Sequence, residues 1–510
     1  MHRAVRRGLS VGKRLGEIVR GIAQLDGVLG DLAIGGISVD SRTVRRGDLF
    51  VALRGARTDG HDFLAAAARS GAAAALVEKE AASPLLPCVR VPSTASALPA
   101  VAAAFHGDPS SKLAVVGVTG TNGKTTVTYL LESILAAAGF RAVVIGSIDY
   151  RLNGRALRTG LTTPFPHELQ EVMAEGLAKG ATHVAMEVSS HSTVQGRIEG
   201  VRFDAGLFTN LSHDHLDFHG DMESYFLAKA RFFREFLPAG GKGARMAVNA
   251  GDAYGRRLAR EFPQALTYGI SEEWAVRPES VEMTREGTRM TLATPGGSLA
   301  LESNLIGPHN VSNVMAAVCG AILLGIRGEA VAEGVKRLPG VPGRVEGIPN
   351  GRGIHIFVDY AHTPDGLDQV LAGLREISAD RLIAVFGCGG NRDRTKRPEM
   401  GRAAARRSDV VIVTSDNPRD EDPEAIIGEI VPGVAAEGFV PAGGGGPGDR
   451  GTYEIIPDRK SAIRRALDIA RPGDTVVIAG KGHEHVQIIG DRCLPFDDRE
   501  AVRAVLASGG

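Results

Sequence analysis

The chain has 510 residues, a length that favours about three domains of roughly 100–200 residues each. Lys plus Arg and Asp plus Glu both number 59, and this balance argues against a protein that works mainly by covering a phosphate backbone. Hydrophobic residues make up 43% of the chain, too many for a largely disordered protein. We therefore expect several folded cores and no nucleic-acid partner.

The cysteines and the start of the chain indicate the compartment. The 4 cysteines stand singly, so neither a zinc ribbon nor a disulfide framework is indicated, and reduced thiols fit a cytoplasmic protein. No run approaches the ~18–20 apolar residues of a membrane helix, so no membrane insertion is expected. The basic start MHRAVRRGLSVGKR lacks the apolar stretch of a signal peptide. A transit peptide is the alternative, although residues 16–19 already read as the opening of a helix.

Residues 1–112 are predicted to form a first α/β domain. GISVDSRTVRRGDLFVAL reads as two strands, and DFLAAAARSGAAAALVEK reads as helix, turn and strand. The segment FHGDPSSKL, with Pro109 and two serines, indicates a linker.

Residues 113–341 are predicted to form a central domain. The apolar run LAVVGVTG, a glycine-rich turn, the helix KTTVTYLLESILAAAG and the strand RAVVIGSI form a βαβ unit, which implies a mostly parallel sheet. THVAMEVSS and FDAGLFTNLS read as further strands, and HNVSNVMAAVCGAILLGI reads as an amphipathic helix.

Residues 342–510 are predicted to form a Rossmann-like domain, beginning near VPGRVEGIPNGRG. Its strand-like runs end in polar or glycine-rich residues, as parallel strands do where ligands bind. The tract at 441–451, PAGGGGPGDRG, is interpreted as a flexible surface loop without chemistry. The strand-like runs are IHIFVDYAHTPD, RLIAVFGCGG, DVVIVTSDNPR and TVVIAGKGHE.

A phosphate-binding loop is predicted at residues 117–126, GVTGTNGKTT, between a strand and a helix. Backbone N–H groups and the helix N-terminus would face phosphate oxygens. Lys124 would bridge the β- and γ-phosphates, and the Thr125 hydroxyl would bind Mg²⁺. The first glycine of the common pattern falls at Val118, so the alternative is a glycine-rich turn that binds nothing.

Two acidic or histidine-rich sites follow the phosphate loop. Glu187 ends the strand HVAMEVSSH, where a carboxylate can reach a metal ion, although a solvent-facing glutamate is the alternative. Residues 210–219, NLSHDHLDFH, hold three histidines and two aspartates. They are either a metal cluster or a polar loop with solvated histidines, and composition favours the loop.

The motifs GVTGTNGKTT, MEVSSH, NLSHDHLDFHG, GPHNVSN, PGRVE and VDYAHTPD occur in this order across residues 117–365. Together they resemble the Mur ligases, the ATP-dependent amide-forming enzymes of peptidoglycan precursor synthesis. VDSR and GDLFVAL before them, and GCGGNRDRTKRP, DNPR and GKGHE after them, resemble the diaminopimelate-adding members. The resemblance implies three α/β domains: one for a UDP end, a central P-loop ATPase and a Rossmann-like domain for the incoming amino acid.

The resemblance also implies a reaction. ATP phosphorylates a carboxylate, and the acyl phosphate is captured by an amine. The expected substrates are UDP-N-acetylmuramoyl-L-alanyl-D-glutamate, meso-2,6-diaminopimelate and ATP, with Mg²⁺ as the metal. We expect a monomer whose domains close on the substrates, because water would hydrolyse the acyl phosphate.

The resemblance assigns the reacting centre to a few residues. It implies catalytic roles for Lys124, Glu187, His215 and Lys229, with Thr125, Glu187 and His215 as metal ligands. Lys229 corresponds to the family's carbamylated lysine (N6-carboxylysine), whereas its own sequence context reads as a surface lysine. ATP contacts are implied for Gly120, Thr121, Asn122, Gly123, Lys124, Thr125, Thr126, Asn310, Arg344 and Asp359. The alternatives are a helix N-cap for Asn310 and a surface salt bridge for Arg344.

The nucleotide-linked dipeptide is expected at two places in the chain. Arg197 can pair with a carboxylate, which suits an acidic peptide. The turn Ala56-Arg57-Thr58 corresponds to a UDP-pocket position but departs from the composition common in the family. For Thr162 and Thr163, capping of a turn before Pro164 is the alternative. The implied contacts are Val39, Ser41, Thr162, Thr163, Ser189, Gln195 and Arg197.

The amino-acid site is expected in the last domain. Diaminopimelate carries one more carboxylate than lysine, and Arg419 of DNPR could hold it through two hydrogen bonds. Glu484 would accept from the distal ammonium. A solvated basic helix start is the alternative for NRDRTKRPEMGRAAARR. The implied residues are Arg392, Asp416, Asn417, Pro418, Arg419, Gly480 and Glu484.

Other functions remain open from the sequence. A lysine-adding sibling or a folylpolyglutamate-type ligase shares the central motifs. A P-loop ATPase motor or transporter subunit would hydrolyse ATP without an amino-acid acceptor, but no strand near the phosphate loop ends in the aspartate it should carry. A non-catalytic UDP-sugar-binding module would not need Lys124, Thr125, Glu187 and Lys229 together.

Overall fold

The computed structural model describes residues 12–25, 27–55, 58–79, 86–442 and 450–508. The chain start, Ala56, Arg57 and most of the glycine-rich tract lie outside the described residues, so the predictions for them stay predictions. The chain forms two compact units. The first comprises residues 1–117, 140–206 and 231–245, and the second comprises 118–139, 207–230 and 246–510.

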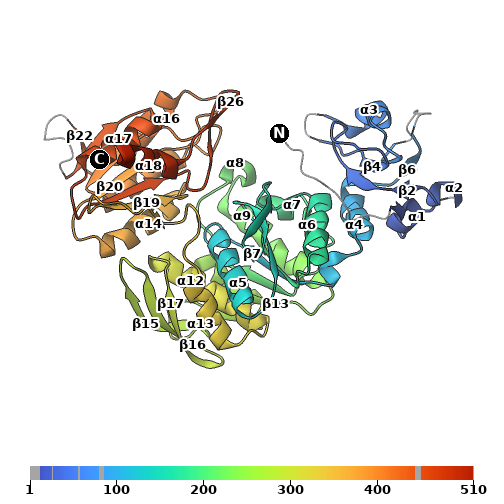
Figure 1. Ribbon diagram of the computed structural model, residues 1–510, viewed down its shortest axis with the longest axis horizontal. Coiled ribbons are helices and arrows are strands. Elements are labelled where there is room, and N and C mark those ends of the chain that lie inside the picture. Colours follow the sequence, from blue (N-terminus) through green and yellow to red (C-terminus); the bar gives the residue numbers. More distant parts are fainter. Residues whose placement is uncertain (1–11, 26, 56–57, 80–85, 443–449, 509–510) are drawn as a thin grey trace. The chain divides into compact units, whose positions relative to one another are not determined.

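The first domain is built on a four-stranded parallel sheet, coloured blue in Figure 1, with the order β3-β4-β5-β6. Alternate residues of β4 and of the position after it enter two cores: Leu49 and Val51 pack with α1 and α4, while Phe50 and Ala52 pack with α3. This alternation follows from the two-residue period of a strand. The predicted strands and helix are confirmed. Helix α4 reaches into the predicted linker, which is therefore shorter than expected.

The elements of this domain are β1 Lys13–Arg14, α1 Leu15–Ile18, α2 Gly27–Gly30, β2 Ala33–Ile34, β3 Gly36–Ser38, β4 Asp48–Val51, α3 Leu64–Arg69, β5 Ala74–Val77, β6 Cys88–Arg90 and α4 Thr94–His106.

The strands between residues 114 and 268 form an eight-stranded sheet with the order β10-β9-β8-β11-β7-β12-β13-β14. β11 pairs in parallel with β8, and β13 pairs in parallel with β14, whereas β9 and β10 add an antiparallel edge. The phosphate loop joins β7 to α5, as the sequence predicts. A separate antiparallel sheet, β15-β16-β17, follows later in the chain.

The strands of these sheets are β7 Ala114–Thr119, β8 Ala142–Ile145, β9 Tyr150–Leu152, β10 Arg155–Arg158, β11 His183–Glu187, β12 Ala205–Phe208, β13 Arg245–Asn249, β14 Leu266–Tyr268, β15 Arg277–Met283, β16 Thr288–Thr294 and β17 Gly297–Ser303. The helices are α5 Lys124–Ala137, α6 Pro166–Ala178, α7 Ser190–Val194, α8 Leu216–His219, α9 Met222–Arg231, α10 Leu237–Ala239, α11 Ala253–Glu261, α12 Pro308–Leu323 and α13 Gly328–Arg337.

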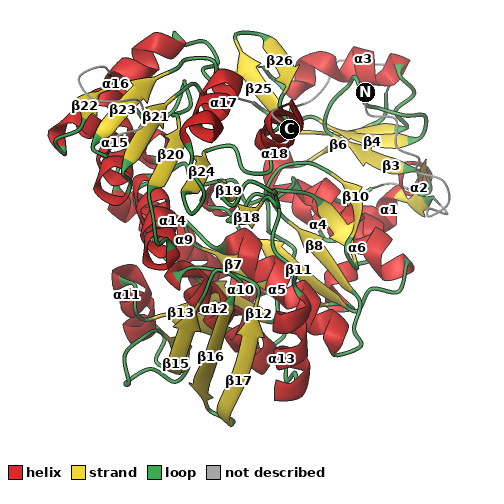
Figure 2. Ribbon diagram, turned by 60° about the vertical axis from the view of Figure 1, so that its left-hand side comes forward, coloured by secondary structure: helices red, strands yellow, loops and turns green. Residues whose placement is uncertain are grey.

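The last domain has helices on both faces of a seven-stranded sheet with the order β18-β19-β24-β20-β21-β23-β22 (Figure 2). On β20, Leu382 and Ala384 pack with α14, α15 and α16, while Ile383 and Val385 pack with α17 and α18. All strands but β18 run in parallel. Burial on both faces explains the continuous apolar runs in the sequence.

The elements of this domain are β18 Glu346–Gly347, β19 His355–Asp359, α14 Pro364–Ile377, β20 Leu382–Phe386, α15 Lys396–Arg407, β21 Val410–Val413, α16 Pro423–Ala436, β22 Val440–Pro441, β23 Thr452–Ile455, α17 Arg459–Ile469, β24 Thr475–Ala479, β25 Val486–Ile489, β26 Arg492–Pro495 and α18 Asp498–Ser508.

The four polar sequences that follow β19, β20, β21 and β24 lie at one edge of this sheet, because the carboxyl ends of parallel strands point the same way. The hairpin β25–β26 covers one of them: Arg419 N donates to Ile488 O (3.0 Å), and Gly490 N donates to Arg419 O (2.7 Å). The parallel order of these strands thus brings the polar sequences that follow them to the same edge of the sheet.

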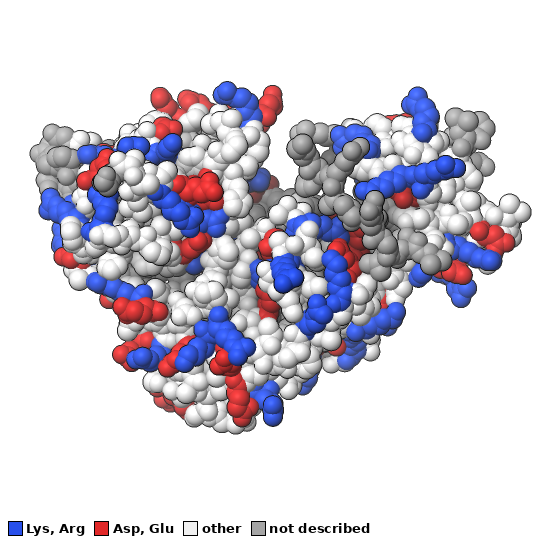
Figure 3. All heavy atoms as spheres, in the orientation of Figure 1, with Lys and Arg blue, Asp and Glu red and all other residues white. Residues whose placement is uncertain are grey.

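Lys and Arg side chains are interspersed with Asp and Glu on the face shown in Figure 3, in keeping with the zero net charge. Within the described ranges, no helix has the length and apolar character needed to cross a membrane.

Candidate active site

The phosphate loop is held by the segment that follows β12. Thr121 N donates to Asn210 O (2.9 Å), Asn122 N donates to Asn210 Oδ1 (2.9 Å), and the Thr209 hydroxyl donates to Asn122 O (2.6 Å). At Gly120, φ is +147° and a Cβ would lie 1.9 Å from Thr209 Oγ1, so no larger residue fits. These contacts hold the backbone of the loop in place up to the N-terminus of α5, which begins at Lys124.

Two lysines meet at the loop. Lys124 Nζ donates to Gly120 O (2.9 Å) and Thr121 O (2.7 Å), and Lys229 Nζ donates to the same Gly120 O (2.7 Å). Lys229 is fully buried, with its Nζ 4.7 Å from the centre of the Tyr225 ring. Desolvation, followed by repulsion from Lys124, holds the pKa of Lys229 well below its usual value. The interpretation of Lys229 as a surface lysine is wrong.

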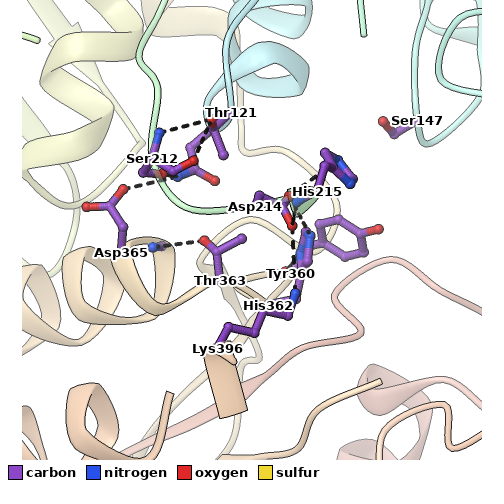
Figure 4. A network of polar contacts seen from close by, with 12 residues as sticks. Thr121, Ser147, Ser212, Asp214, His215, Tyr360, His362, Thr363, Asp365 and Lys396 are labelled. Carbon is purple, nitrogen blue, oxygen red and sulfur yellow. Dashed lines mark hydrogen bonds and ion pairs between the residues drawn. The ribbon is translucent and has the colours of Figure 1, made fainter. Parts of the chain in front are cut away.

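Asp214 stands at the centre of a charged network (Figure 4). Its carboxylate lies 3.3 Å from His215 Nε2, 3.7 Å from His362 Nε2 and 3.7 Å from Lys396 Nζ. Desolvation is the largest influence and raises the pKa of Asp214, but its hydrogen bond with His362 and its interactions with His362, His215 and Lys396 together hold the pKa well below the usual range. Asp214 is therefore an anion at neutral pH.

The phosphate-loop region also contacts the last domain. Asn122 Nδ2 donates to Asp365 Oδ2 at the start of α14 (3.2 Å). His213 Nε2 lies 2.7 Å from Asp393 Oδ2. The histidine-rich loop therefore makes specific pairs, and the prediction of solvated histidines is wrong for His213. No described group of three or more His, Cys, Asp or Glu residues has the arrangement of a metal site, so the metal-cluster interpretation is wrong as well.

Three residues expected to contact ATP lie close to this network. Arg344 Nη2 donates to Thr125 Oγ1 (3.2 Å), and its guanidinium lies 4.4 Å from the centre of the Tyr360 ring, so the interpretation of Arg344 as a surface salt bridge is wrong. Asp359 is buried and accepts from Val345 N (2.7 Å).

Asn310 lies inside α12 rather than at its N-cap, which is Gly307, so the N-cap interpretation is also wrong. Its amide donates to Ile306 O (2.8 Å) and accepts from Asn313 (2.9 Å).

Glu187 belongs to a second polar cluster, which lies in the first unit. Its carboxylate accepts from Ser147 N (2.9 Å) and Ser147 Oγ (3.1 Å), and the residue is 1% exposed. The solvent-facing interpretation of Glu187 is therefore wrong. Thr163 Oγ1 donates to Glu187 O (2.9 Å), and Thr162 Oγ1 lies 3.0 Å from Ser147 Oγ. These threonines bond across the cluster rather than capping a turn.

Arg197 borders the same cluster. Its guanidinium donates to Thr163 O (3.0 Å) and to Gln195 Oε1 (2.8 Å), and it lies 4.6 Å from the centre of the Phe165 ring. Ser189 caps α7 and contacts Thr163 Oγ1 (3.2 Å). The structure thus brings together the five residues at 162–197 that the sequence assigns to the dipeptide. Val39 and Ser41 follow β3 in the first domain.

The DNPR sequence follows β21 at the carboxyl edge of the sheet in the last domain. Asp416, Asn417 and Pro418 are buried, whereas Arg419 is half-buried and has φ +53°. Arg419 Nη1 donates to Gly390 O (2.7 Å), which fixes the guanidinium beside the GGNRD loop.

Two guanidinium groups, those of Arg392 and Arg419, lie near each other at this edge of the sheet. Desolvation and then the nearby Arg392 lower the pKa of Arg419. Among the described residues, neither arginine forms an ion pair. Glu484 lies near Arg419 as well and accepts from Asn417 Nδ2 (2.8 Å). The prediction of a solvated basic helix start fails for Lys396 and Arg397 in α15, which are buried.

Comparison with known proteins connects these sites to one family. The chain matches the Mur ligase family catalytic domain over residues 33–106, the Mur ligase middle domain over residues 118–321 and the Mur ligase glutamate ligase domain over residues 343–482. A Geobacter metallireducens protein named UDP-N-acetylmuramoyl-L-alanyl-D-glutamate–2,6-diaminopimelate ligase is 46% identical over 481 residues, 93% of this chain and 94% of that protein. The chain belongs to the Mur ligase family.

Further relatives support this membership. A protein of the same name from Gloeobacter violaceus is 45% identical and covers 94% of this chain and 95% of its own length. A solved structure with that name is 33% identical, covers 98% of this chain and 99% of its own, and has a TM-score of 0.67. MurF from Acinetobacter baumannii is 20% identical with a TM-score of 0.68 over 92% of this chain and 95% of its own, and shows the fold alone. The predicted three-domain α/β fold is confirmed.

Several residues of this Mur ligase escape sequence reasoning. Ser147 follows β8 and holds Glu187, Asp365 holds the phosphate-loop Asn122, and Lys481 lies buried beside Asn417. The signal for Lys481 was a lysine between two glycines after an apolar strand. Nothing local marks Asp365, because only the tertiary fold brings it to the loop.

Proposed function

We propose that this Mur ligase adds meso-2,6-diaminopimelate to UDP-N-acetylmuramoyl-L-alanyl-D-glutamate, with ATP as the energy source. The observation that carries the proposal is the pair of guanidinium groups, Arg392 and Arg419, beside the carboxylate of Glu484. A distal carboxylate and ammonium on one carbon, as in diaminopimelate, match this arrangement of charges. The names of the relatives above support the same choice.

ATP is proposed to bind the phosphate loop. Lys124 would turn from the loop carbonyls to the phosphates, and the N–H groups at the start of α5 would face the same oxygens. Arg344, which contacts Thr125, would add a second cation. These groups stabilise the charge that gathers as the glutamate carboxylate attacks the γ-phosphorus and ADP leaves. The remaining proposed ATP contacts are Gly120, Thr121, Asn122, Gly123, Thr126, Asn310 and Asp359.

Mg²⁺ is the proposed metal. Mg²⁺ is typically held by few protein ligands, with water and substrate phosphate oxygens completing its coordination. The described residues fit an ion that is bound in this way. Thr125, Glu187 and His215 are the proposed protein ligands. The ion would offset phosphate charge, and the residues named here would orient it.

Lys229 is proposed to be carbamylated. Its depressed pKa favours the neutral amine, whose nitrogen can attack the carbon of CO₂ and lose a proton to give a carbamate. The change puts an anion in place of one of the two amino groups that share the Gly120 carbonyl oxygen. It thereby removes the repulsion between Lys124 and Lys229.

The nucleotide substrate is proposed to place its peptide end at the cluster of Thr162, Thr163, Ser189, Gln195 and Arg197. Arg197 would release a backbone carbonyl to pair with a substrate carboxylate. Val39 and Ser41 are the proposed contacts of the UDP end.

The second step is proposed at the last domain. The amine nitrogen of diaminopimelate attacks the acyl carbon, the C–O bond to phosphate breaks, and the nitrogen loses a proton to give the amide. The pocket residues Arg392, Asp416, Asn417, Pro418, Arg419, Gly480 and Glu484 would hold the far end of the acceptor and thereby orient the attacking amine.

Phosphate release tests the proposal. We expect rapid release when ATP, Mg²⁺, the UDP-linked dipeptide and diaminopimelate are all present, with a tripeptide product in the mass spectrum. Omitting either the dipeptide or the acceptor should abolish steady release. Equal ATP hydrolysis without the acceptor would contradict the ligase proposal and favour an ATPase.

A further inference from the structure

A fully buried lysine that the proposed reaction does not use contacts two residues of the proposed acceptor site. Lys481 follows β24, and its side chain has 0% exposure. Its Nζ donates to Glu484 Oε2 (2.8 Å) and to Asn417 Oδ1 (3.1 Å). Burying an ammonium is costly unless its partners are well placed, so these two contacts define its role.

Lys481 fixes the orientation of the Asn417 amide. Asn417 Oδ1 accepts from Lys481 and from the backbone N–H of Ile488 (3.0 Å), and both of these groups can only donate. The oxygen must therefore face them, which directs Nδ2 to Glu484 Oε2 (2.8 Å). A flipped amide would place its NH₂ against two donors.

Lys481 also selects which oxygen of Glu484 remains for a ligand. Oε2 already accepts from both Lys481 and Asn417. Oε1 accepts no hydrogen bond from the part of the chain that the structure describes, and the side chain is 30% exposed. One carboxylate oxygen is thus held by the protein, while the other is left to accept from a ligand.

We infer that Lys481 is a positioning residue that sets acceptor specificity: it holds Asn417 and Glu484 so that Glu484 Oε1 receives the distal ammonium of the acceptor. This inference rests on the proposed function. Without the ammonium, the inner oxygens of Asn417 and Glu484 lose a shared donor, and the Glu484 carboxylate loses its countercharge. The carboxylate is then free to rotate away from the acceptor.

The test compares two acceptors. 2-Aminopimelate keeps both carboxylates of diaminopimelate but lacks the distal amine. In the wild-type enzyme we expect its KM to exceed that of diaminopimelate by about 10- to 100-fold, the range of one hydrogen bond between charged groups. In Lys481→Met, the KM for diaminopimelate should rise about tenfold or more, while the KM values for 2-aminopimelate and ATP stay within about threefold.

The KM for 2-aminopimelate divided by the KM for diaminopimelate separates positioning from general damage. Loss of positioning lowers this ratio, whereas general damage raises both KM values together. Lys460→Met, at an exposed position on α17, is the matched control and should keep the wild-type ratio. If Lys481→Met shows no cooperative thermal unfolding, Lys481→Gln is measured in the same way and should also lower the ratio.

Two results would overturn the inference: an unchanged ratio in a folded Lys481 variant, or a wild-type enzyme that uses both acceptors equally well. A wild-type enzyme that releases phosphate with neither acceptor would instead contradict the proposed function.

Discussion

At the scale of single residues, the shared carbonyl oxygen of Gly120 concentrates positive charge. The amino groups of Lys124 and Lys229 lie within 3 Å of this oxygen, so two positive charges there would repel each other, and an anion or a modified lysine relieves the conflict. The same crowding of cations suits a site where phosphate charge gathers. The charge of Lys229 is therefore expected to matter more for turnover than for folding.

Replacing Lys229 tests this expectation. Lys229→Ala should lower kcat by about 100- to 1000-fold, the range for one lost electrostatic group in an active site. A short-chain carboxylic acid added to the variant should restore part of the rate by supplying an anion. Steady-state phosphate release measures both effects, with Lys460→Ala as the control. A variant with wild-type kcat would contradict the proposed carbamate.

His309 predicts a pH effect on stability. It is partly buried, and desolvation lowers its pKa to about 4, against about 6.5 in an unfolded chain. The unfolded state therefore binds more protons between these pH values, so stability falls as pH falls through that window. The loss should reach about 3 kcal/mol near pH 4. His309→Asn should flatten the pH dependence of urea unfolding, and an unchanged slope would exclude this cause.

At the scale of elements, one buried ion pair joins the helices α17 and α18 to the strands that carry the acceptor pocket. Arg459 and Asp498 have 0% side-chain exposure and lie 2.7 Å apart. Arg459 also donates to Ala479 O at the end of β24 (2.9 Å) and to Ser415 O after β21 (3.5 Å). Despite the opposing effect of desolvation, Asp498 raises the pKa of Arg459.

Breaking this pair should destabilise the last domain. Asp498→Asn leaves a buried guanidinium without its countercharge, and we expect a loss of about 3–5 kcal/mol in the free energy of unfolding. Glu437→Gln removes the partner of Arg406 in an exposed pair and should cost at most about 1 kcal/mol. Urea unfolding of both variants gives the comparison. Equal losses would mean that burial does not determine the strength of this pair.

The phosphate loop predicts a second effect at the same scale. Gly120→Ala would place a methyl group against Thr209 Oγ1 and strain the backbone at φ +147°. We expect ATP affinity to fall by about 10- to 100-fold. Gly139→Ala is a matched control, because Gly139 also has positive φ (+84°) but nothing within 4 Å of its Cβ position. Calorimetric ATP binding distinguishes them, and similar losses would show that the loop contact is unimportant.

At the scale of the whole molecule, the sequence predicts the order of strands and helices well, because buried parallel strands read as apolar runs with polar ends. The convergence of DNPR, GGNRD and GKGHE follows from parallel strand order. The contacts between Asn122 and Asp365 and between Lys481 and Asn417 cannot be predicted from strand order, since the partners are 243 and 64 residues apart. Burial also overturned the surface interpretations of Glu187 and Lys229, because composition does not show which polar residue a fold encloses.

The central claim is that paired guanidinium groups select an acceptor with two acidic ends. The most direct measurement compares kcat/KM for diaminopimelate and for lysine in phosphate release by the wild-type enzyme. We expect diaminopimelate to be favoured by at least about 100-fold, because lysine would leave the arginines without a desolvated partner. Comparable or faster turnover with lysine would contradict the account.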